Sequence, residues 1–296
     1  MTNKTFDRIT ITGGALLVMV CLLWGGNMVS IKISNRGIPP LMAATVRSVI
    51  AAVLVMTYSR LKGRNVLLRG SDIKHGVIIG VLFGLDFLFL YWGTLFTNAS
   101  RAIMFLYTHP FWVALGAHFF LQDDRLDSWK IAGLVLAFGG LLSVFGSRST
   151  ELGHFYWVGD LMLVAAAIFW AATTLYIKKT MAGRQISHYQ TLFAQLVYSI
   201  PVLGLGWFVV EGGQGVTLNM TVVLAFTYQS IVIAFFSYVL WFWMIHTFPV
   251  SRLAAFTFLT PIFGVILGGI VLGDPLPVAL WIGLGCIAGG IYLVNR

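Results

Sequence analysis

The sequence predicts an all-α integral membrane protein that crosses the bilayer about ten times. Three observations lead to this fold class. The 296 residues are 58% hydrophobic and only 10% charged. The apolar runs are continuous over roughly 20 residues, the length that a helix needs to cross the hydrocarbon core, whereas a barrel strand needs about ten residues of alternating polarity. The connections between the runs are short, so no domain outside the membrane is expected.

The predicted spans follow from the residues that break the apolar runs. The first run comes after Lys4 and Arg8 and is too long for the apolar region of a cleavable signal peptide, so it is expected to remain as a membrane helix. Later breaks are rich in Gly, Pro, Asn, Asp or basic residues, as in NRGIPP (35–40) and GDPLP (273–277). The resulting spans are roughly 11–33, 40–58, 75–95, 98–120, 130–146, 157–177, 189–210, 219–245, 252–272 and 278–295.

The distribution of Lys and Arg predicts the orientation, because cytoplasmic loops are enriched in these residues. With a cytoplasmic N-terminus, 14 basic residues lie inside: Lys4, Arg8, Arg60, Lys62, Arg64, Arg69, Lys74, Arg125, Lys130, Lys178, Lys179, Arg184, Arg252 and Arg296. Four lie outside: Lys32, Arg36, Arg101 and Arg148. Both termini are therefore expected to be cytoplasmic. The net charge of +9 then reports loop charges that orient the helices, and no nucleic-acid partner is expected.

The two halves of the chain repeat each other. LLWGGNMVSIK (22–32) matches AIFWAATTLYIK (167–178), and LYWGTLFTNASRAIMFLYTHPFW (90–112) matches WFWMIHTFPVSRLAAFTFLTPIF (241–263). The matched positions include Trp24/Trp170, Lys32/Lys178, Ser100/Ser251, Arg101/Arg252 and Pro110/Pro261. Residues 1–150 and 151–296 thus each hold five spans, and because five is odd the second half crosses the membrane in the opposite sense. Inverted repeats of this kind support alternating access in many secondary transporters.

These repeats, with the openings LLWGGN and IFWAAT and the acidic turns QDDRL and GDPLP, resemble the drug/metabolite transporter superfamily, specifically the ten-helix EamA-type bacterial exporters. The resemblance covers essentially the whole chain. Such turns usually carry Glu, and here they carry Asp124 and Asp274. The resemblance implies export across the bacterial cytoplasmic (inner) membrane, and the superfamily's substrates include amino acids, aromatic compounds, nucleobases, sugars and drugs.

Two charged residues lie inside predicted spans. Arg47 is about seven residues from the outer end of the second span, and Asp86 is about nine residues from the outer end of the third. At about 1.5 Å of rise per residue the two have similar depth, and a lone charge there costs on the order of 3 kcal/mol. Three interpretations remain open: a fixed ion pair between the two helices, a site where Arg47 binds the acid group of a zwitterion, or proton coupling at Asp86 when Arg47 is released.

Aromatic residues predict the wall of a central cavity. Trp24 and Asn27 lie one turn apart in the first span, and Trp170 takes the matching place in the sixth. Positions related by the repeat meet across the central axis. A cavity between such residues suits a planar or apolar solute, although a Trp inside a helix often only fills space.

The fourth and ninth spans carry the remaining candidates. His109 is either a neutral residue that is hydrogen-bonded to a neighbouring helix or part of a proton relay. Pro110 and Pro261 permit bends, so these two helices are expected to flex during gating. No His, Cys or carboxylate lies at metal-ligand spacing around His109, and no GxxxxGK[ST] loop is present, so no metal or cofactor is expected.

The predicted function is a secondary transporter that exports a small amphipathic metabolite, an amino acid or an aromatic compound, with protons as a candidate coupling ion. Its cavity is expected to be lined by Trp24, Asn27, Arg47, Asp86, His109 and Trp170. A passive channel or a lipid scramblase is the main alternative. An intramembrane enzyme is disfavoured because acids are sparse and His109 stands alone. Its expected partners are the solute and the lipid bilayer, and a monomer is compatible with the sequence.

Overall fold

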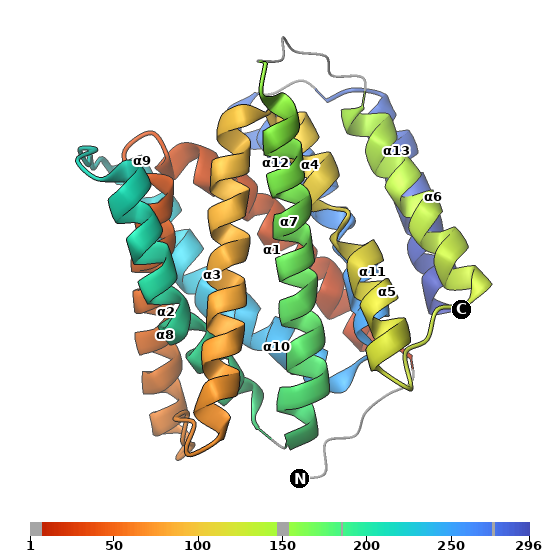
Figure 1. Cartoon of the computed structure of the whole chain (residues 1–296). Coiled ribbons are helices and arrows are strands. Elements are labelled where there is room, and N and C mark those ends of the chain that lie inside the picture. Colours follow the sequence, from red (N-terminus) through yellow and green to blue (C-terminus); the bar gives the residue numbers. More distant parts are fainter. Residues whose placement is uncertain (1–7, 147–153, 185, 274–275) are drawn as a thin grey trace.

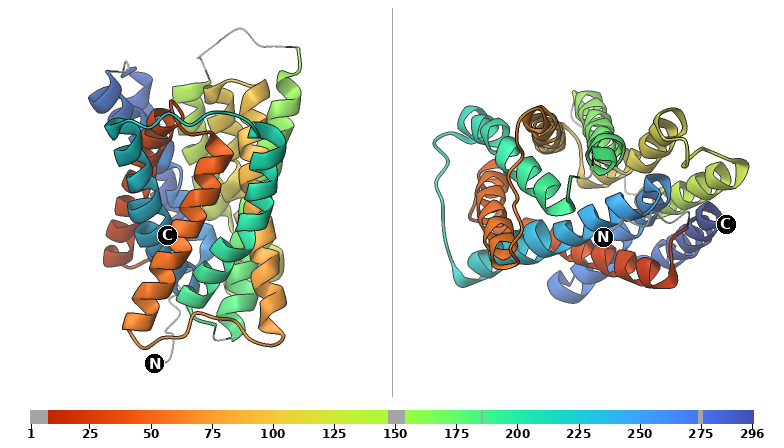
Figure 2. Two further views of the ribbon diagram at one scale, coloured as in Figure 1. Left: turned by 90° about the vertical axis from the view of Figure 1, so that its left-hand side faces the viewer. Right: turned by 90° about the horizontal axis from the view of Figure 1, so that it is seen from below.

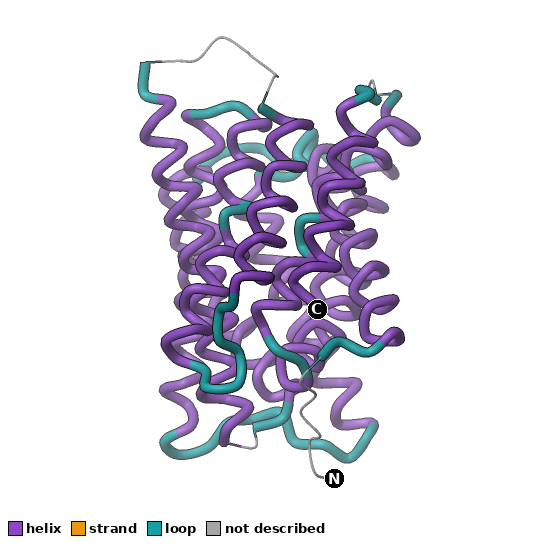
Figure 3. The backbone as a smooth tube through the Cα atoms, turned by 90° about the vertical axis from the view of Figure 1, so that its right-hand side faces the viewer, coloured by secondary structure: helices purple, strands orange, loops and turns teal. Residues whose placement is uncertain are grey.

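The computed structural model describes residues 8–146, 154–184, 186–273 and 276–296. These residues form helices and connecting loops without a strand, which confirms the all-helical class (Figure 3). Within them, nine helical segments are long and apolar enough to cross a membrane. The tenth, Ala279–Asn295, has 17 residues, or about 26 Å of helix against a hydrocarbon core of about 30 Å. Its crossing therefore stays a prediction, and Lys4, Arg148 and Asp274 lie outside the described residues.

The helices follow the predicted spans closely (Figure 1). The first five spans are α1 (Ile11–Ser34), α2 (Pro40–Leu61), α3 (Asp72–Phe96), α4 (Ala99–Leu106) with α5 (His109–Phe120), and α6 (Ser128–Phe145). The other five are α7 (Tyr156–Tyr176) with η1 (Ile177–Met181), α8 (His188–Gly206) with η3 (Trp207–Glu211), α9 (Met220–Thr227) with η4 (Tyr228–Ser237) and α10 (Tyr238–Thr247), α11 (Val250–Phe256) with α12 (Leu259–Leu272), and α13 (Ala279–Asn295). A short turn, η2 (Ala182–Arg184), follows η1, and η1, η3 and η4 are π-helical.

Local signals set several helix ends. The Thr10 side chain accepts a hydrogen bond from the Gly13 amide at 3.0 Å and caps α1. Ser187 and Gln190 form a reciprocal capping box at the start of α8. Gly273 ends α12 in the left-handed conformation, with φ of 73°, which a residue without a Cβ adopts at low cost.

The helices pack into one bundle, with α6 and α13 together at one edge (Figure 2). Inside it, α3 lies against α7 and α8, α2 lies against α8, and α1 lies against α12. Glycine permits the last contact, because a Cβ on Gly25 would lie 2.8 Å from the Gly264 backbone nitrogen. Small residues at a helix crossing let the two backbones approach in this way.

The fourth and ninth spans are each broken near the middle. Residues 107–108 separate α4 from α5, and residues 257–258 separate α11 from α12. Pro110 and Pro261 lie in the first turns of the second halves, where a residue without an N–H loses no helical hydrogen bond. In Figure 1, α4 lies above α5 whereas α11 lies below α12, so the two broken spans run in opposite directions. The sequence predicts flexing at these prolines, and the structure has an interruption beside each.

Candidate functional site

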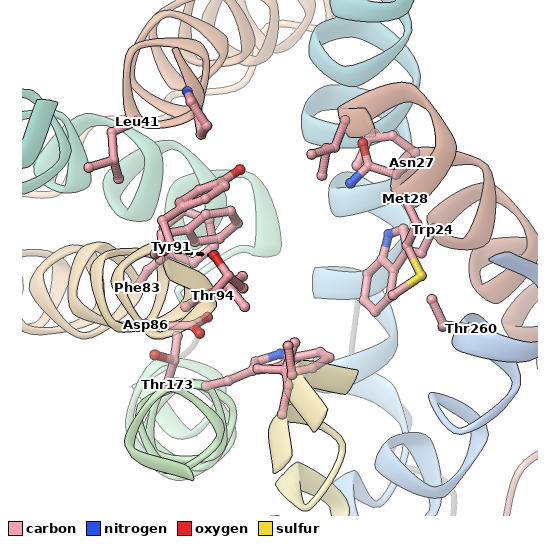
Figure 4. A pocket seen from close by; sticks show the side chains of 18 of the residues that line it. Trp24, Asn27, Met28, Leu41, Phe83, Asp86, Tyr91, Thr94, Thr173 and Thr260 are labelled. Atoms are coloured by element: carbon pink, nitrogen blue, oxygen red, sulfur yellow. Dashed lines mark hydrogen bonds between the residues drawn. The ribbon is translucent and has the colours of Figure 1, made fainter. Parts of the chain in front are cut away.

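A cavity of about 730 Å³ lies at the centre of the bundle (Figure 4). Its rim includes the exposed residues Asn35, Ala99 and Gln214, at the end of the bundle where α1 and α3 end and α4 begins. Its deep end reaches Ile177 and Ile245. Ten of the lining residues are aromatic: Trp24, Phe83, Phe87, Tyr91, Trp92, Tyr107, Trp170, Tyr238, Trp241 and Phe242.

Trp24 is the centre of an aromatic cluster at the deep end of this cavity. Its ring lies 6.2 Å from Trp170, 5.0 Å from Trp241 and 6.3 Å from Tyr238, measured between ring centroids. Its indole nitrogen donates a hydrogen bond of 2.9 Å to the Ser237 hydroxyl. The two tryptophans related by the repeat therefore meet, as the sequence predicts, and the hydrogen bond fixes the indole plane. Asn27, one turn further along α1, also lines the cavity.

Asp86 lines the cavity from α3. Figure 4 shows it beside Thr173 of α7, with Trp24 and Thr260 across the open space. The residue is only 6% exposed. Among the described residues, no side chain or backbone amide forms a hydrogen bond or an ion pair with it. Burial of a carboxylate without a counter-ion costs free energy, and a hydrogen-bonded cationic group would offset that cost.

Arg47 is buried behind the cavity wall and does not line it. Its guanidinium carbon lies 4.9 Å from the centroid of the Phe87 ring, and the residue is 2% exposed. Its Nε and Nη2 atoms have no hydrogen-bond partner among the described residues. In this conformation of the described chain, the fixed ion pair with Asp86 is therefore not formed.

His109 packs against the Trp170 ring, outside the cavity lining. The two rings are stacked, with centroids 3.8 Å apart and planes 17° apart. The histidine is fully buried, and neither ring nitrogen has a hydrogen-bond partner within the described part of the chain. The expected hydrogen bond to a neighbouring helix is therefore wrong for this structure. His109 supports the tryptophan from behind and does not line the cavity.

Glu211 is a lining residue that the sequence analysis missed. Its carboxylate accepts hydrogen bonds from the backbone amides of Leu41, at 2.9 and 3.0 Å, and of Met42, at 3.1 Å. These amides belong to the first turn of α2, which begins at Pro40, follows Pro39 and has no side-chain cap of its own. Glu211 supplies that cap from the end of η3. The only signal in the sequence is an acid near the end of the seventh span, which an interfacial residue would give equally well.

At the opposite end of the cavity the lining residues Ile177 and Ile245 are each 1% exposed, so this end is closed. The Lys178 ammonium, in η1, donates a hydrogen bond of 3.0 Å to the carbonyl of Phe248, which follows α10. Asp124 of the QDDRL turn accepts from the Ser251 amide and from the Lys130 ammonium, each at 2.8 Å, and so caps α11. These contacts tie the sixth span to the loop between the eighth and ninth spans, and the QDDRL turn to the start of the ninth span.

A model of the EamA-like transporter family matches residues 11–146 and, a second time, residues 157–296. The chain belongs to this family. It is therefore a multi-pass membrane transporter, and its family and relatives indicate transport and not enzyme catalysis. Within the described residues, no group of three His, Cys, Asp or Glu side chains is arranged to hold a metal ion.

Relatives of this EamA-like transporter align over nearly its whole length. A probable amino-acid metabolite efflux pump of Salmonella typhimurium is 30% identical, with 95% of this chain and 93% of the relative covered. A protein of the same description from Escherichia coli is 28% identical, with 95% and 93% covered. A solved crystal structure that is 18% identical superposes with a TM-score of 0.81 and covers 96% of each chain. That likeness shows the fold alone.

Proposed function

We propose that this transporter is a secondary exporter that carries a small amphipathic metabolite out of a bacterial cytoplasm by alternating access. The observation that supports this most is the central cavity, which is rich in aromatic residues, open at one end of the bundle and closed by Lys178 at the other. A carrier needs a binding site that reaches one side of the membrane at a time. A cavity of about 730 Å³ lies within the size range of sites that hold small solutes.

The helix contacts support an inverted repeat of 1–150 and 151–296. The third span, α3 of the first half, packs on α7 and α8 of the second half. Its counterpart in the second half, the eighth span, packs on α1 through α9 and η4, and on α2 through η4. The contact between α1 and α12 has its counterpart between α7 and α5. Each of these contacts therefore has a counterpart when the two halves are exchanged. In a rocking carrier, the same exchange of halves relates the two end states.

We infer that both termini are cytoplasmic, in the inner membrane, and that this conformation faces outward. Basic residues are concentrated on the N-terminal side of the membrane, and the open rim lies where α1 and α3 end. The transition to the inward-facing state requires release of the contact between Lys178 and Phe248. The broken spans at Pro110 and Pro261 are the proposed gating elements, because each can change direction without loss of a regular helical hydrogen bond.

We assign Trp24, Asn27, Asp86 and Trp170 to solute binding, and Asp86 to coupling. Asp86 can hold either a proton or a cationic group of the solute, so exchange of the two would couple export to a proton gradient. We assign His109 to support of the Trp170 ring. Arg47 lies behind the Phe87 ring, so Phe87 would have to move before Arg47 could contact the solute. The relatives described as amino-acid metabolite efflux pumps favour solutes of that size.

Counterflow in proteoliposomes tests the proposed function. Liposomes that hold purified protein are loaded with an unlabelled solute and diluted into a labelled one, across a panel of amino acids, aromatic compounds and amines, with and without an inside-acid pH gradient. A carrier accumulates label transiently above equilibrium. Equilibration without overshoot, together with a measurable single-channel current, would instead indicate the channel alternative.

A further inference from the structure

We propose that the cavity selects an organic cation, an amine with an aromatic or apolar body, and that Asp86 binds its charged nitrogen. This inference rests on the proposed transport function and narrows its substrate class. Its starting point is the charge of the cavity wall. Two acids, Asp86 and Glu211, line the described cavity, and no Lys, Arg or His side chain does so. A wall of this composition attracts cations and repels anions.

The two acids differ in what they can still bind. The Glu211 carboxylate already accepts three backbone hydrogen bonds at the start of α2. Asp86 forms no hydrogen bond or ion pair within the described part of the chain and is 6% exposed, so its oxygens are free to accept hydrogen bonds from a solute. An ammonium group on the solute that donates a hydrogen bond to Asp86 would offset the free-energy cost of burying this carboxylate. A neutral hydroxyl would offset only part of that cost.

Aromatic rings surround the position that the ammonium would take. Phe83 and Phe87 lie one turn before Asp86 and next to it on α3, and their centroids are 4.8 Å apart. Tyr238 approaches Phe83 edge-on at 6.2 Å, and Tyr91 lies 6.0 Å from Phe87. All four residues line the cavity together with Asp86. Faces of aromatic rings attract cations electrostatically, and more strongly where water is excluded. Because Phe87 already carries the Arg47 guanidinium on its ring, Phe83, Tyr91 and Tyr238 are the rings left for the ammonium.

The same wall disfavours a free carboxylate on the solute. The nearest candidate to neutralise it is Arg47, which lies behind the Phe87 ring and outside the lining. A zwitterionic amino acid would therefore bury its carboxylate in the cavity without a cationic partner, and the cost of that burial would count against binding. An amine that lacks the carboxylate avoids this cost and keeps both the aromatic and the ionic contacts.

Four probes that share a phenyl body and differ in the polar end test the proposal: phenethylamine, 2-phenylethanol, phenylalanine and 3-phenylpropionate. Binding of each to the purified full-length protein is measured by isothermal titration calorimetry at one pH. We expect phenethylamine to bind roughly 30-fold more tightly than phenylalanine or 2-phenylethanol, and 3-phenylpropionate to bind weakest. This comparison uses the wild-type protein, so it does not depend on whether a variant folds.

Asp86→Asn then tests the assigned residue. It should weaken binding of phenethylamine by roughly 30-fold and leave that of 2-phenylethanol nearly unchanged. Asp127→Asn is the matched control, because this exposed carboxylate caps α6, a role that Asn fills equally well, and lies outside the cavity lining, so its loss should change neither.

If phenylalanine binds as tightly as phenethylamine or more tightly, the cation proposal is overturned, and transport of amino acids remains. Loss of phenylalanine binding in Arg47→Gln would then show that Arg47 binds the carboxylate of the amino acid. An unchanged affinity for phenethylamine in Asp86→Asn would also overturn the cation proposal. If none of the four probes binds, the cation proposal fails, and the counterflow panel decides separately whether the protein transports another solute.

Discussion

At the scale of single residues, contacts between side chains set the wall of the cavity: Trp24 meets Trp170, and the Arg47 guanidinium packs on the Phe87 ring. Trp24 and Trp170 could be placed together because the repeat relates their positions. The depth of Arg47 and Asp86 was also predictable from helix rise. Their pairing depends instead on which side of α3 faces α2. Phe87 occupies that place and stacks on the guanidinium group, which a sequence pattern cannot specify.

Trp170 provides a residue-scale prediction about solute binding. Trp170→Ala should weaken binding of an aromatic solute by roughly 5- to 20-fold, because it removes one ring of the cavity wall and uncovers His109. Trp170→Phe should retain most of the affinity. Trp157→Ala is the control, since this tryptophan of the same helix is 53% exposed and lies far from the cavity. Equal effects of Trp170→Ala and Trp157→Ala in a titration with solute would argue against this wall.

Glu211 provides a prediction about stability. Glu211→Ala should destabilise the folded protein by about 1–2 kcal/mol, because the amides of Leu41 and Met42 lose a buried acceptor. Glu211→Gln keeps one acceptor oxygen and should lose less. Thermal unfolding in detergent measures both, with the exposed Gln214→Ala as a control. An unchanged Tm in Glu211→Ala would show that α2 does not depend on this cap.

At the scale of helices, apolar run length predicted the spans within a few residues, because each span must cross the same thickness of hydrocarbon. The interruptions at 107–108 and 257–258 were not placed, although the nearby prolines were noted. The apolar run continues through both interruptions, so hydropathy does not detect them. The π-helical stretches were equally invisible, since they depend on local packing and not on composition.

The pair formed by α6 and α13 gives a prediction at this scale. A Cβ on Gly140 would lie 2.7 Å from the Gly283 carbonyl oxygen of α13, whereas a Cβ on Gly139 would meet nothing within 4 Å. Gly140→Val should therefore lower the Tm in detergent by several degrees, and Gly139→Val should leave it nearly unchanged. Similar behaviour of these two adjacent variants would contradict the packing of α6 on α13.

At the scale of the whole molecule, the family and the helical membrane fold could be predicted because the repeat and its motifs extend over the full chain. The conformational state could not, since a sequence does not specify which of several accessible conformations is populated. The closed end shown here depends on a few contacts, among them that between Lys178 and Phe248. Lys32 takes the place of Lys178 in the first half, so the proposed inverted repeat predicts a matching contact of Lys32 at the other end of the bundle in the proposed inward-facing state.

Alternating access is tested most directly by the reactivity of one cysteine from each side of the membrane. Thr174→Cys, in a background without Cys21 and Cys286, places a thiol deep in the cavity. We expect a small membrane-impermeant thiol reagent to label it from outside. Addition of Lys178→Met should lower labelling from outside and raise it from inside, as one side opens at the expense of the other. Labelling that rises from both sides together would contradict a carrier and indicate a continuous pore.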